Sequence, residues 1–151
     1  VYLYLDRIQD PGNLGALART AEAAGAAGIA LSPGTVHPSH PRALRGSAGS
    51  LLRLSAAVDA APDELDHHLE KAGASPRWVA LATRGGRGLW EADLDGGLVL
   101  ALGAEGPGLS SDVEDRCDLR VTIPLEAPVE SLNVAVAAAL VLFEIRRRRR
   151  R

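Results

Sequence analysis

The stretch Val121–Ile145, VTIPLEAPVESLNVAVAAALVLFEI, joins a short apolar strand to a polar loop and a long apolar helix. Pro124 ends the strand. No Gly or Pro interrupts the run from Asn133 to the end of the stretch, which is long enough for a helix of about four turns. The run has no polar face, which predicts a helix buried on most of its circumference. Ser131 and Asn133 stand where the loop meets this helix, so we expect them to face a site.

Length and composition indicate one compact domain. The chain has 151 residues, 46% of them hydrophobic, which is enough for a sizeable core. No apolar run approaches the roughly 18 residues that span a bilayer, and the opening residues VYLYLD are typical of a strand rather than a signal peptide. Cys117 is the only cysteine, so an internal disulfide is excluded. We therefore expect a reducing, cytoplasmic location.

The formal net charge of −2 hides an uneven distribution. The run Arg146–Arg151 supplies six of the 17 basic residues, which leaves the rest of the chain strongly acidic, with 19 Asp and Glu. Two interpretations of this basic tail remain open. It is either an arm for nucleic-acid phosphates or a solvated helix end, where arginine suits the helix dipole.

The remaining chain alternates short apolar runs with helical segments. The expected strands cover residues 1–5, 28–32, 51–58, 78–83, 98–102 and 119–123. The expected helices cover residues 14–24, with Asn13 as N-cap, then 42–50, 62–72, 110–117 and the final apolar run. Apolar strands separated by helices indicate an α/β fold, a single-domain parallel sheet with helices on both faces.

Three loops follow predicted strands, at the edge of the sheet where ligands bind in such folds. They are DPGNLG at 10–15, GAEGPGLS at 103–110, and the loop that runs from Ile123 into the final helix. Glycines in the second loop allow the backbone to approach a ligand closely. Glu105 in the same loop disfavours a phosphate ligand, because a carboxylate repels an anion. Arg19, on the helix after the first loop, is either a site residue or an ordinary surface residue.

The resemblance of these loops to a known family is specific. DPGNLGALARTAEAAG, ALGAEGPGLS and IPLEAPVESLNVAVAAALVLFE resemble, in order, the three signature motifs of the SpoU (TrmH-like) RNA ribose methyltransferases of the SPOUT class. The residues of the first two motifs are most similar to those of the RlmB-type branch, which modifies a guanosine of large-subunit ribosomal RNA. The resemblance implies a C-terminal deep trefoil knot, a catalytic domain at residues 1–145 and a basic tail at 146–151.

The resemblance also implies S-adenosylmethionine as cofactor, bound in the knot largely by backbone groups. The matching cofactor-binding positions are Gly103, Ile123 and Leu132, with Thr83, Leu102, Gly106 and Leu125 as expected neighbours. The matching catalytic positions are Asn13, Arg19, Glu105, Ser131 and Asn133. Arg19 matches the residue held to activate the ribose 2′-hydroxyl. Because a guanidinium stays protonated, we expect it to orient the 2′-oxygen or adjacent phosphate and to stabilise the developing alkoxide.

The partners that the resemblance implies are RNA, with rRNA favoured over tRNA, and a second copy in a homodimer. Arg42 and Arg45 lie where related proteins place an RNA-facing segment. His37 and His40 have no acid or cysteine nearby, so no metal site is expected. Many RlmB-type relatives carry a separate N-terminal RNA-binding domain, which we expect to be absent here. The lack of methionine favours a fragment over a minimal member.

Two other function classes are less consistent with the residues. A nucleotide-binding oxidoreductase would carry GxGxxG after the first strand, and this chain does not. A knotted RNA-binding protein without catalysis would not need Asn13, Arg19, Glu105 and Asn133 together. A tRNA 2′-O-methyltransferase of the same family is the remaining alternative.

Overall fold

The computed structural model describes residues 1–150, and within them seven strands form one sheet in the order β3-β2-β1-β6-β4-β7-β5. All neighbouring strands are parallel, which confirms the predicted α/β sheet. The strands are β1 Tyr2–Asp6, β2 Gly28–Leu31, β3 Ser55–Ala57, β4 Arg77–Leu81, β5 Arg87–Gly88, β6 Leu98–Gly103 and β7 Leu119–Thr122.

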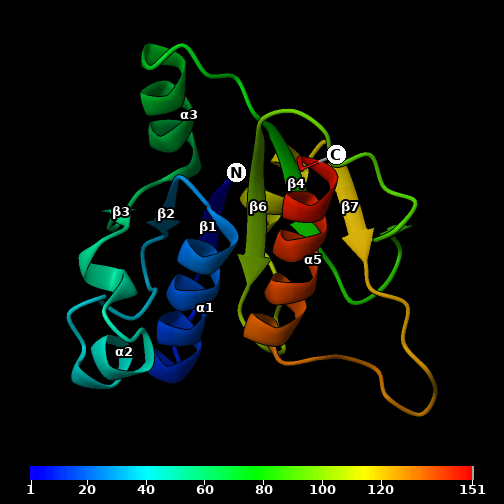
Figure 1. The fold of residues 1–151 in the computed structure, drawn as a ribbon, viewed down its shortest axis with the longest axis horizontal. Helices are drawn as coiled ribbons and strands as arrows, with labels where there is room; N and C mark the ends of the chain where they lie inside the picture. The colour runs from blue at the N-terminus through cyan, green and yellow to red at the C-terminus, as the bar shows by residue number, and fades with distance from the viewer. Residues whose placement is uncertain (151) are drawn as a thin grey trace.

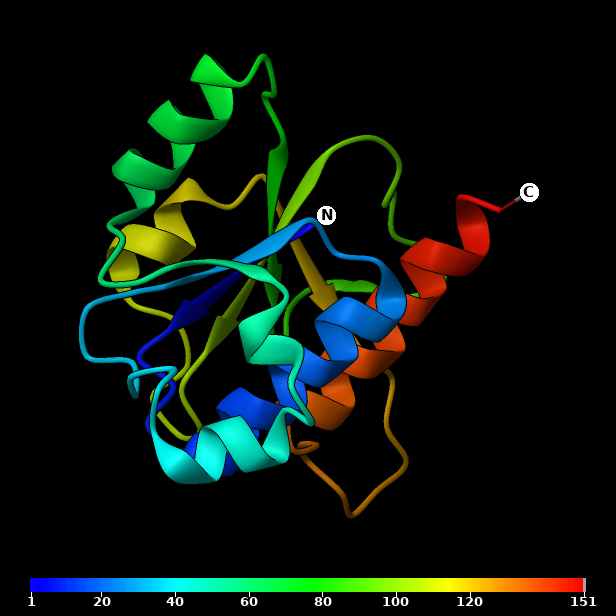
Figure 2. The same ribbon diagram turned by 60° about the vertical axis from the view of Figure 1, so that its left-hand side comes forward.

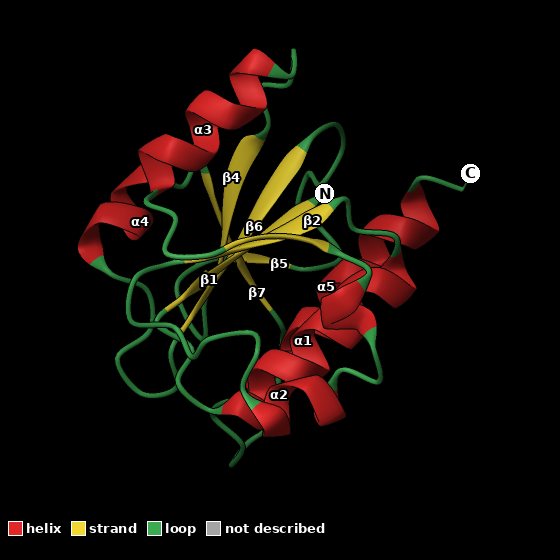
Figure 3. Cartoon of the chain, turned by 90° about the vertical axis from the view of Figure 1, so that its left-hand side faces the viewer, coloured by secondary structure: helices red, strands yellow, loops and turns green. Residues whose placement is uncertain are grey.

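Helices cover both faces of the sheet, as predicted (Figures 1, 2 and 3). The helices are α1 Pro11–Ala24, α2 Pro41–Gly46, α3 Pro62–Lys71, α4 Ser111–Arg116 and α5 Val134–Arg148. Helices α1, α2 and α5 lie on one side, where leucines of α1 and the inner residues of α5 form the larger core with the strands. Helices α3 and α4 lie on the other side over a smaller core around Tyr4 and Trp78. None of the described helices combines the length and apolarity needed to cross a bilayer.

The start of α1 differs from the prediction in a way that matters for function. The helix begins at Pro11, and its N-cap is Asp10, whose carboxylate accepts the Asn13 N–H at 2.8 Å. The prediction that Asn13 caps the helix is therefore wrong. Proline is favoured at the first helical position, so the DP pair starts the helix earlier. The side chain of Asn13 is left to contact other loops.

Two further boundaries were wrong. Most of the strand predicted at 51–58 is absent, because Ser50–Leu52 forms a 3-10 turn and only β3 remains, with exposed side chains at the edge of the sheet. The helix predicted at 42–50 ends at Gly46. Strand β5 was not predicted at all. It has two residues and exists through its pairing with β7, a partner that local sequence does not reveal.

Helix α5 is buried on one side only. Its buried residues include Ala138, Val141 and Ile145, but Val136, Leu140 and Phe143 are 51%, 43% and 48% exposed. The prediction of burial on most of its circumference is therefore wrong for a single chain. Spacings of four and three residues place the exposed side chains on one stripe of the helix.

A glycine sets the distance between α1 and α2. A Cβ atom added at Gly15 would lie 2.6 Å from the Ala43 carbonyl oxygen and 2.8 Å from the Ser47 nitrogen. The substitution Gly15→Ala should therefore lower the free energy of unfolding by about 1–3 kcal/mol, because backbone must shift to admit the methyl group. Urea denaturation measures the loss.

The matched control is Gly46→Ala, on the facing helix. A Cβ atom there would meet its nearest neighbour, the Gly15 Cα, at 3.6 Å, which is ordinary contact. This variant should keep the stability of the parent. Equal stability of the Gly15→Ala variant and the control would contradict the packing argument.

Candidate active site

The loops that follow β4, β6 and β7 line an open cavity of about 710 Å³ at the carboxyl edge of the sheet. All seven positions predicted to bind the cofactor line it: Thr83, Leu102, Gly103, Gly106, Ile123, Leu125 and Leu132. Three of the five predicted catalytic residues, Glu105, Ser131 and Asn133, line it as well. The structure therefore brings these residues together, and their individual roles stay predictions.

Three side chains from the three motif loops form a closed ring of hydrogen bonds. The Asn13 amide nitrogen donates to Glu105 Oε1 at 3.0 Å, and the Asn133 amide nitrogen donates to the same oxygen at 3.2 Å. The Asn133 nitrogen also donates to Asn13 Oδ1 at 2.9 Å. One carboxylate oxygen thus ties the first and third motif loops to the second.

Asn133 has a second role in the same position. Its Oδ1 accepts the backbone N–H of Ala135 at 3.0 Å and that of Val136 at 3.4 Å, which makes it the N-cap of α5. The amide therefore uses its oxygen for the helix and its nitrogen for the ring. Capping and participation in the site are compatible because they use different atoms of the side chain.

The wall of the cavity formed by residues 103–109 is a tight backbone turn. The Gly108 N–H donates to the Ala104 carbonyl at 2.9 Å, and a Cβ atom at Gly103 would collide with the backbone of Gly108 and Leu109. Only glycine therefore fits at position 103 while the turn is closed. Every residue of this turn lines the cavity, Glu105 among them.

A comparison with known proteins identifies this arrangement of loops. The model of the SpoU rRNA Methylase family matches residues 1–143. The chain belongs to this family.

Relatives within the SpoU family show how far the similarity extends. The 23S rRNA (guanosine(2553)-2′-O)-methyltransferase RlmP of Bacillus subtilis is 35% identical over 95% of this chain and 57% of its own length. The SpoU methyltransferase AviRb of Streptomyces viridochromogenes, solved with AdoMet, has a TM-score of 0.91 at 32% identity, over 99% of this chain and 60% of that one. A second solved structure comes from work on the 2-OH methylation of C/U34 on tRNA. It has a TM-score of 0.85 at 29% identity, and the match covers 99% of this chain and 95% of that one. The chain spans about half the length of the first curated relatives it matches.

Ion pairs that the sequence did not predict add charge to the cavity. The Arg84 guanidinium lies 2.8 Å from Glu130 Oε1, joining the loop after β4 to the third motif loop. Glu114 and Arg120 form a second pair in the lining. Arg84 and Glu130 come from distant segments, so no local pattern could have shown that they meet.

The predicted catalytic residue Arg19 and the predicted RNA-binding residues lie outside this cavity. Arg19 is exposed on α1 and does not line it. Six residues separate Arg19 from Asn13, which places the two side chains roughly 120° apart around the helix axis. Arg42 and Arg45 are exposed on α2. The chain therefore does not bring Arg19 to the ring formed by Asn13.

Arg146 to Arg149 form hydrogen bonds with other groups of the same chain. Helix α5 does not end at Ile145 but continues to Arg148, and Arg151 lies outside the described residues. Hydrogen bonds from Arg147 and Arg148 lower the pKa of Glu144 to about 2. Backbone carbonyls accept hydrogen bonds from three of the arginines: Ala23 from Arg146, Leu89, Trp90 and Ala92 from Arg148, and Gly96 from Arg149. These contacts favour the interpretation of the run as a helix end.

The substitution Asn133→Asp separates the two roles of this side chain. Asp retains an oxygen for the N-cap, but it loses the amide donors and places a negative charge against Glu105. We expect a loss of about 1–3 kcal/mol in the free energy of unfolding at pH 7, measured by urea denaturation.

The control is Asn133→Ser, which keeps a capping oxygen and adds no charge. The Asp variant should be less stable than the Ser variant at pH 7, and the gap should narrow at about pH 4, where the carboxylate introduced at position 133 takes up a proton. An Asp variant at least as stable as the Ser variant at pH 7 would mean that the ring contributes little.

Proposed function

We propose that this chain is an S-adenosylmethionine-dependent RNA methyltransferase domain that methylates a ribose 2′-hydroxyl. The observation that carries the proposal is the ring of Asn13, Glu105 and Asn133, which joins the three motif loops beside a cavity lined by the second and third of them. Family membership supports methyl transfer to RNA, and the AdoMet complex of AviRb supports the cofactor. RlmP, whose name specifies 2′-O-methylation, supports the ribose hydroxyl as acceptor.

The cavity fits S-adenosylmethionine in size and chemistry. Its volume falls in the range of about 300–1,000 Å³ that is typical of small-molecule sites. Ile123 and Leu132, which are partly exposed, supply apolar surface for an adenine ring. Glu105 and Glu130 supply negative charge that suits a sulfonium and an ammonium, and Arg84 suits a carboxylate.

The reaction needs alignment more than a strong base. S-adenosylmethionine, when bound, supplies a methyl group on a positively charged sulfur with a neutral thioether as leaving group. The protein then has to hold the 2′-oxygen in line with the methyl group and assist the loss of one hydroxyl proton. The ring fixes Glu105 at the edge of the cavity, where its carboxylate favours nearby positive charge. A guanidinium from Arg19 would stabilise the developing alkoxide.

Ribosomal RNA is the substrate we favour, because the relative RlmP is named as a 23S rRNA methyltransferase. Transfer RNA is the second candidate. It is supported by the solved structure whose subject is 2-OH methylation of C/U34 on tRNA, because the match covers 95% of the length of that chain.

A homodimer would bring Arg19 to the reaction. The exposed stripe of Val136, Leu140 and Phe143 on α5 is an apolar surface suited to a second copy. Because Arg19 lies away from the cavity of its own chain, we infer that it acts at the cavity of the partner. Each active site would then combine loops from one copy with Arg19 from the other.

The trefoil knot is also part of the proposal. Strand β7 lies between β4 and β5, although it follows both in the sequence. Only residues 82–86 join β4 to β5, and Gly86 accepts a hydrogen bond from Thr122 of β7. The short connection from β4 to β5 must therefore pass over β7, and this supports threading of the C-terminal segment through the loop.

The proposed function is tested by transfer of tritiated methyl groups to total ribosomal and transfer RNA. We expect incorporation into RNA, with the product mapped as a 2′-O-methyl nucleotide. Incorporation into a base would contradict the proposed acceptor, and labelling of tRNA alone would replace rRNA by the second candidate.

Mixing two inactive variants tests the position of Arg19. Alone, Arg19→Ala should abolish methyl transfer while calorimetry still detects S-adenosylmethionine binding, and Asn133→Ala should also be inactive. Mixed dimers contain one complete site, so the mixture should recover up to about a quarter of the parent rate. A control, Arg87→Ala, changes an exposed arginine outside the cavity and should stay active. No recovery on mixing would place Arg19 at the site of its own chain.

A further inference from the structure

A buried carboxylate lies behind the wall of the cavity. Asp6, the last residue of β1, is only 2% exposed, although it carries a charge. It pairs in register with Gly103, the last residue of β6, so it sits where the first residues of the 103–110 loop leave the sheet. Asp6 does not line the cavity itself. A buried charge is stable only when its oxygens are satisfied, so its partners are informative.

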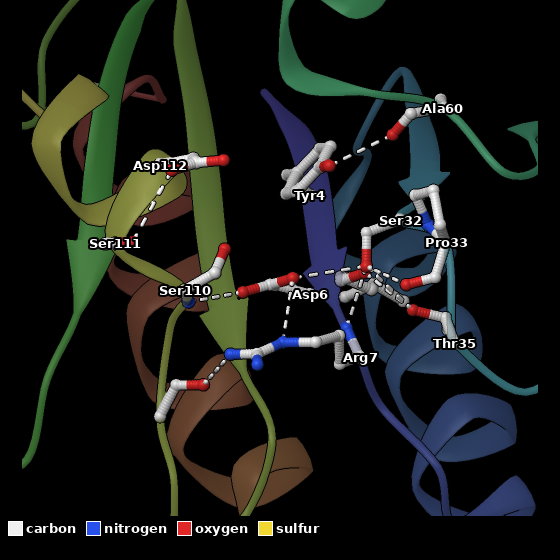
Figure 4. A network of polar contacts seen from close by, with 12 residues as sticks. Tyr4, Asp6, Arg7, Ser32, Pro33, Thr35, Ala60, Ser110, Ser111 and Asp112 are labelled. Atoms are coloured by element: carbon white, nitrogen blue, oxygen red, sulfur yellow. Dashed lines mark hydrogen bonds and ion pairs between the residues drawn. The ribbon is translucent and has the colours of Figure 1, made fainter.

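Both oxygens of Asp6 have partners from other segments (Figure 4). Oδ2 accepts the backbone N–H of Ser110 at 2.6 Å. Oδ1 accepts the Ser32 hydroxyl at 3.2 Å and lies 3.4 Å from Nε of Arg7. The Ser32 hydroxyl oxygen in turn accepts a hydrogen bond of 2.9 Å from the backbone N–H of Arg7. Asp6 therefore joins the loop after β2 to the end of the loop after β6.

The contact with Ser110 fixes the end of the cavity wall. Residues 103–109 all line the cavity, and Ser110 is the next residue along the chain. The start of this wall is held by the pairing of β6 with β1, and Glu105 is held by the ring. At its far end the Gly108 carbonyl accepts a 3.4 Å hydrogen bond from Arg7, and the Ser110 N–H is bound by Asp6.

We propose that Asp6 is a positioning residue for cofactor binding, which acts through the Ser110 N–H to hold the 103–110 loop in its closed form. This inference rests on the proposed function, because it assumes that the cavity takes S-adenosylmethionine. A hydrogen bond to a charged acceptor is stronger than one between neutral groups, and a carboxylate buried this deeply has little water to replace the lost donor. Loss of the contact frees one end of the wall.

The structure offers variants that isolate this one bond. Ser110 has φ −69°, which is the value proline imposes, so Ser110→Pro removes the N–H without changing φ. Ser110→Ala keeps the N–H and is the matched control, because the Ser110 side chain makes no capping hydrogen bond. Asp6→Ala removes both acceptor oxygens, and Asp6→Asn keeps one. Asp118→Asn is a second control. Asp118 accepts a hydrogen bond of 2.9 Å from the backbone N–H of Trp78, and this contact does not involve the 103–110 loop.

Calorimetric titration of each folded variant with S-adenosylmethionine gives the test. We expect Asp6→Ala and Ser110→Pro each to weaken binding about tenfold, with Asp6→Asn between them and the parent. The double variant should be little weaker than the single ones, because both remove the same bond. Both controls should bind within about twofold of the parent, since neither touches this bond.

Three outcomes would overturn the proposal. Parent-like binding by Ser110→Pro would show that the bond does not position the loop, even if Asp6→Ala failed to fold. Losses that multiply in the double variant would show that Asp6 acts by another route. Absence of binding by the parent chain would instead remove the proposed function, and this inference with it.

Discussion

The hydrogen-bond ring of Asn13, Glu105 and Asn133 is the constraint on which the rest of the site depends. It joins residues up to 120 positions apart in sequence. In both asparagines the amide nitrogen donates a hydrogen bond and the amide oxygen accepts one, so these partners determine the orientation of the amide. Because Asn133 also caps α5, the same side chain fixes the helix and the loop before it. The three motif loops therefore behave as one structural unit at the edge of the sheet.

The charges around this unit follow the chemistry it would perform. Three glutamates and two arginines line the cavity, while the exposed arginines Arg19, Arg42 and Arg45 lie on the helices outside it. Under the proposed function, the cationic methyl donor and the anionic RNA would occupy separate surfaces. The arginine run at the end of α5 does not belong to either surface, since its described contacts are mainly with backbone carbonyls and Glu144.

The sequence predicted the parallel sheet and the residues of the cavity, because strand ends and motif loops are local features. It failed where a residue's role depends on a distant partner. Asn13 looked like a cap because its partners, Glu105 and Asn133, are remote in sequence. Strand β5 exists only through β7, and Asp6 fell just after the predicted first strand, where nothing marked it as buried. The family resemblance supplied residue identities, but not the contacts that hold them.

Hydrogen–deuterium exchange with and without S-adenosylmethionine tests the central claim, that the loops after β4, β6 and β7 form one cofactor site. We predict that addition of the cofactor slows exchange in residues 82–86, 103–110 and 124–133 together. The small pocket between the start of β1 and the end of α5, lined by Val1 and Arg146, should not change. Protection confined to that pocket, or to only one of the three loops, would contradict the account.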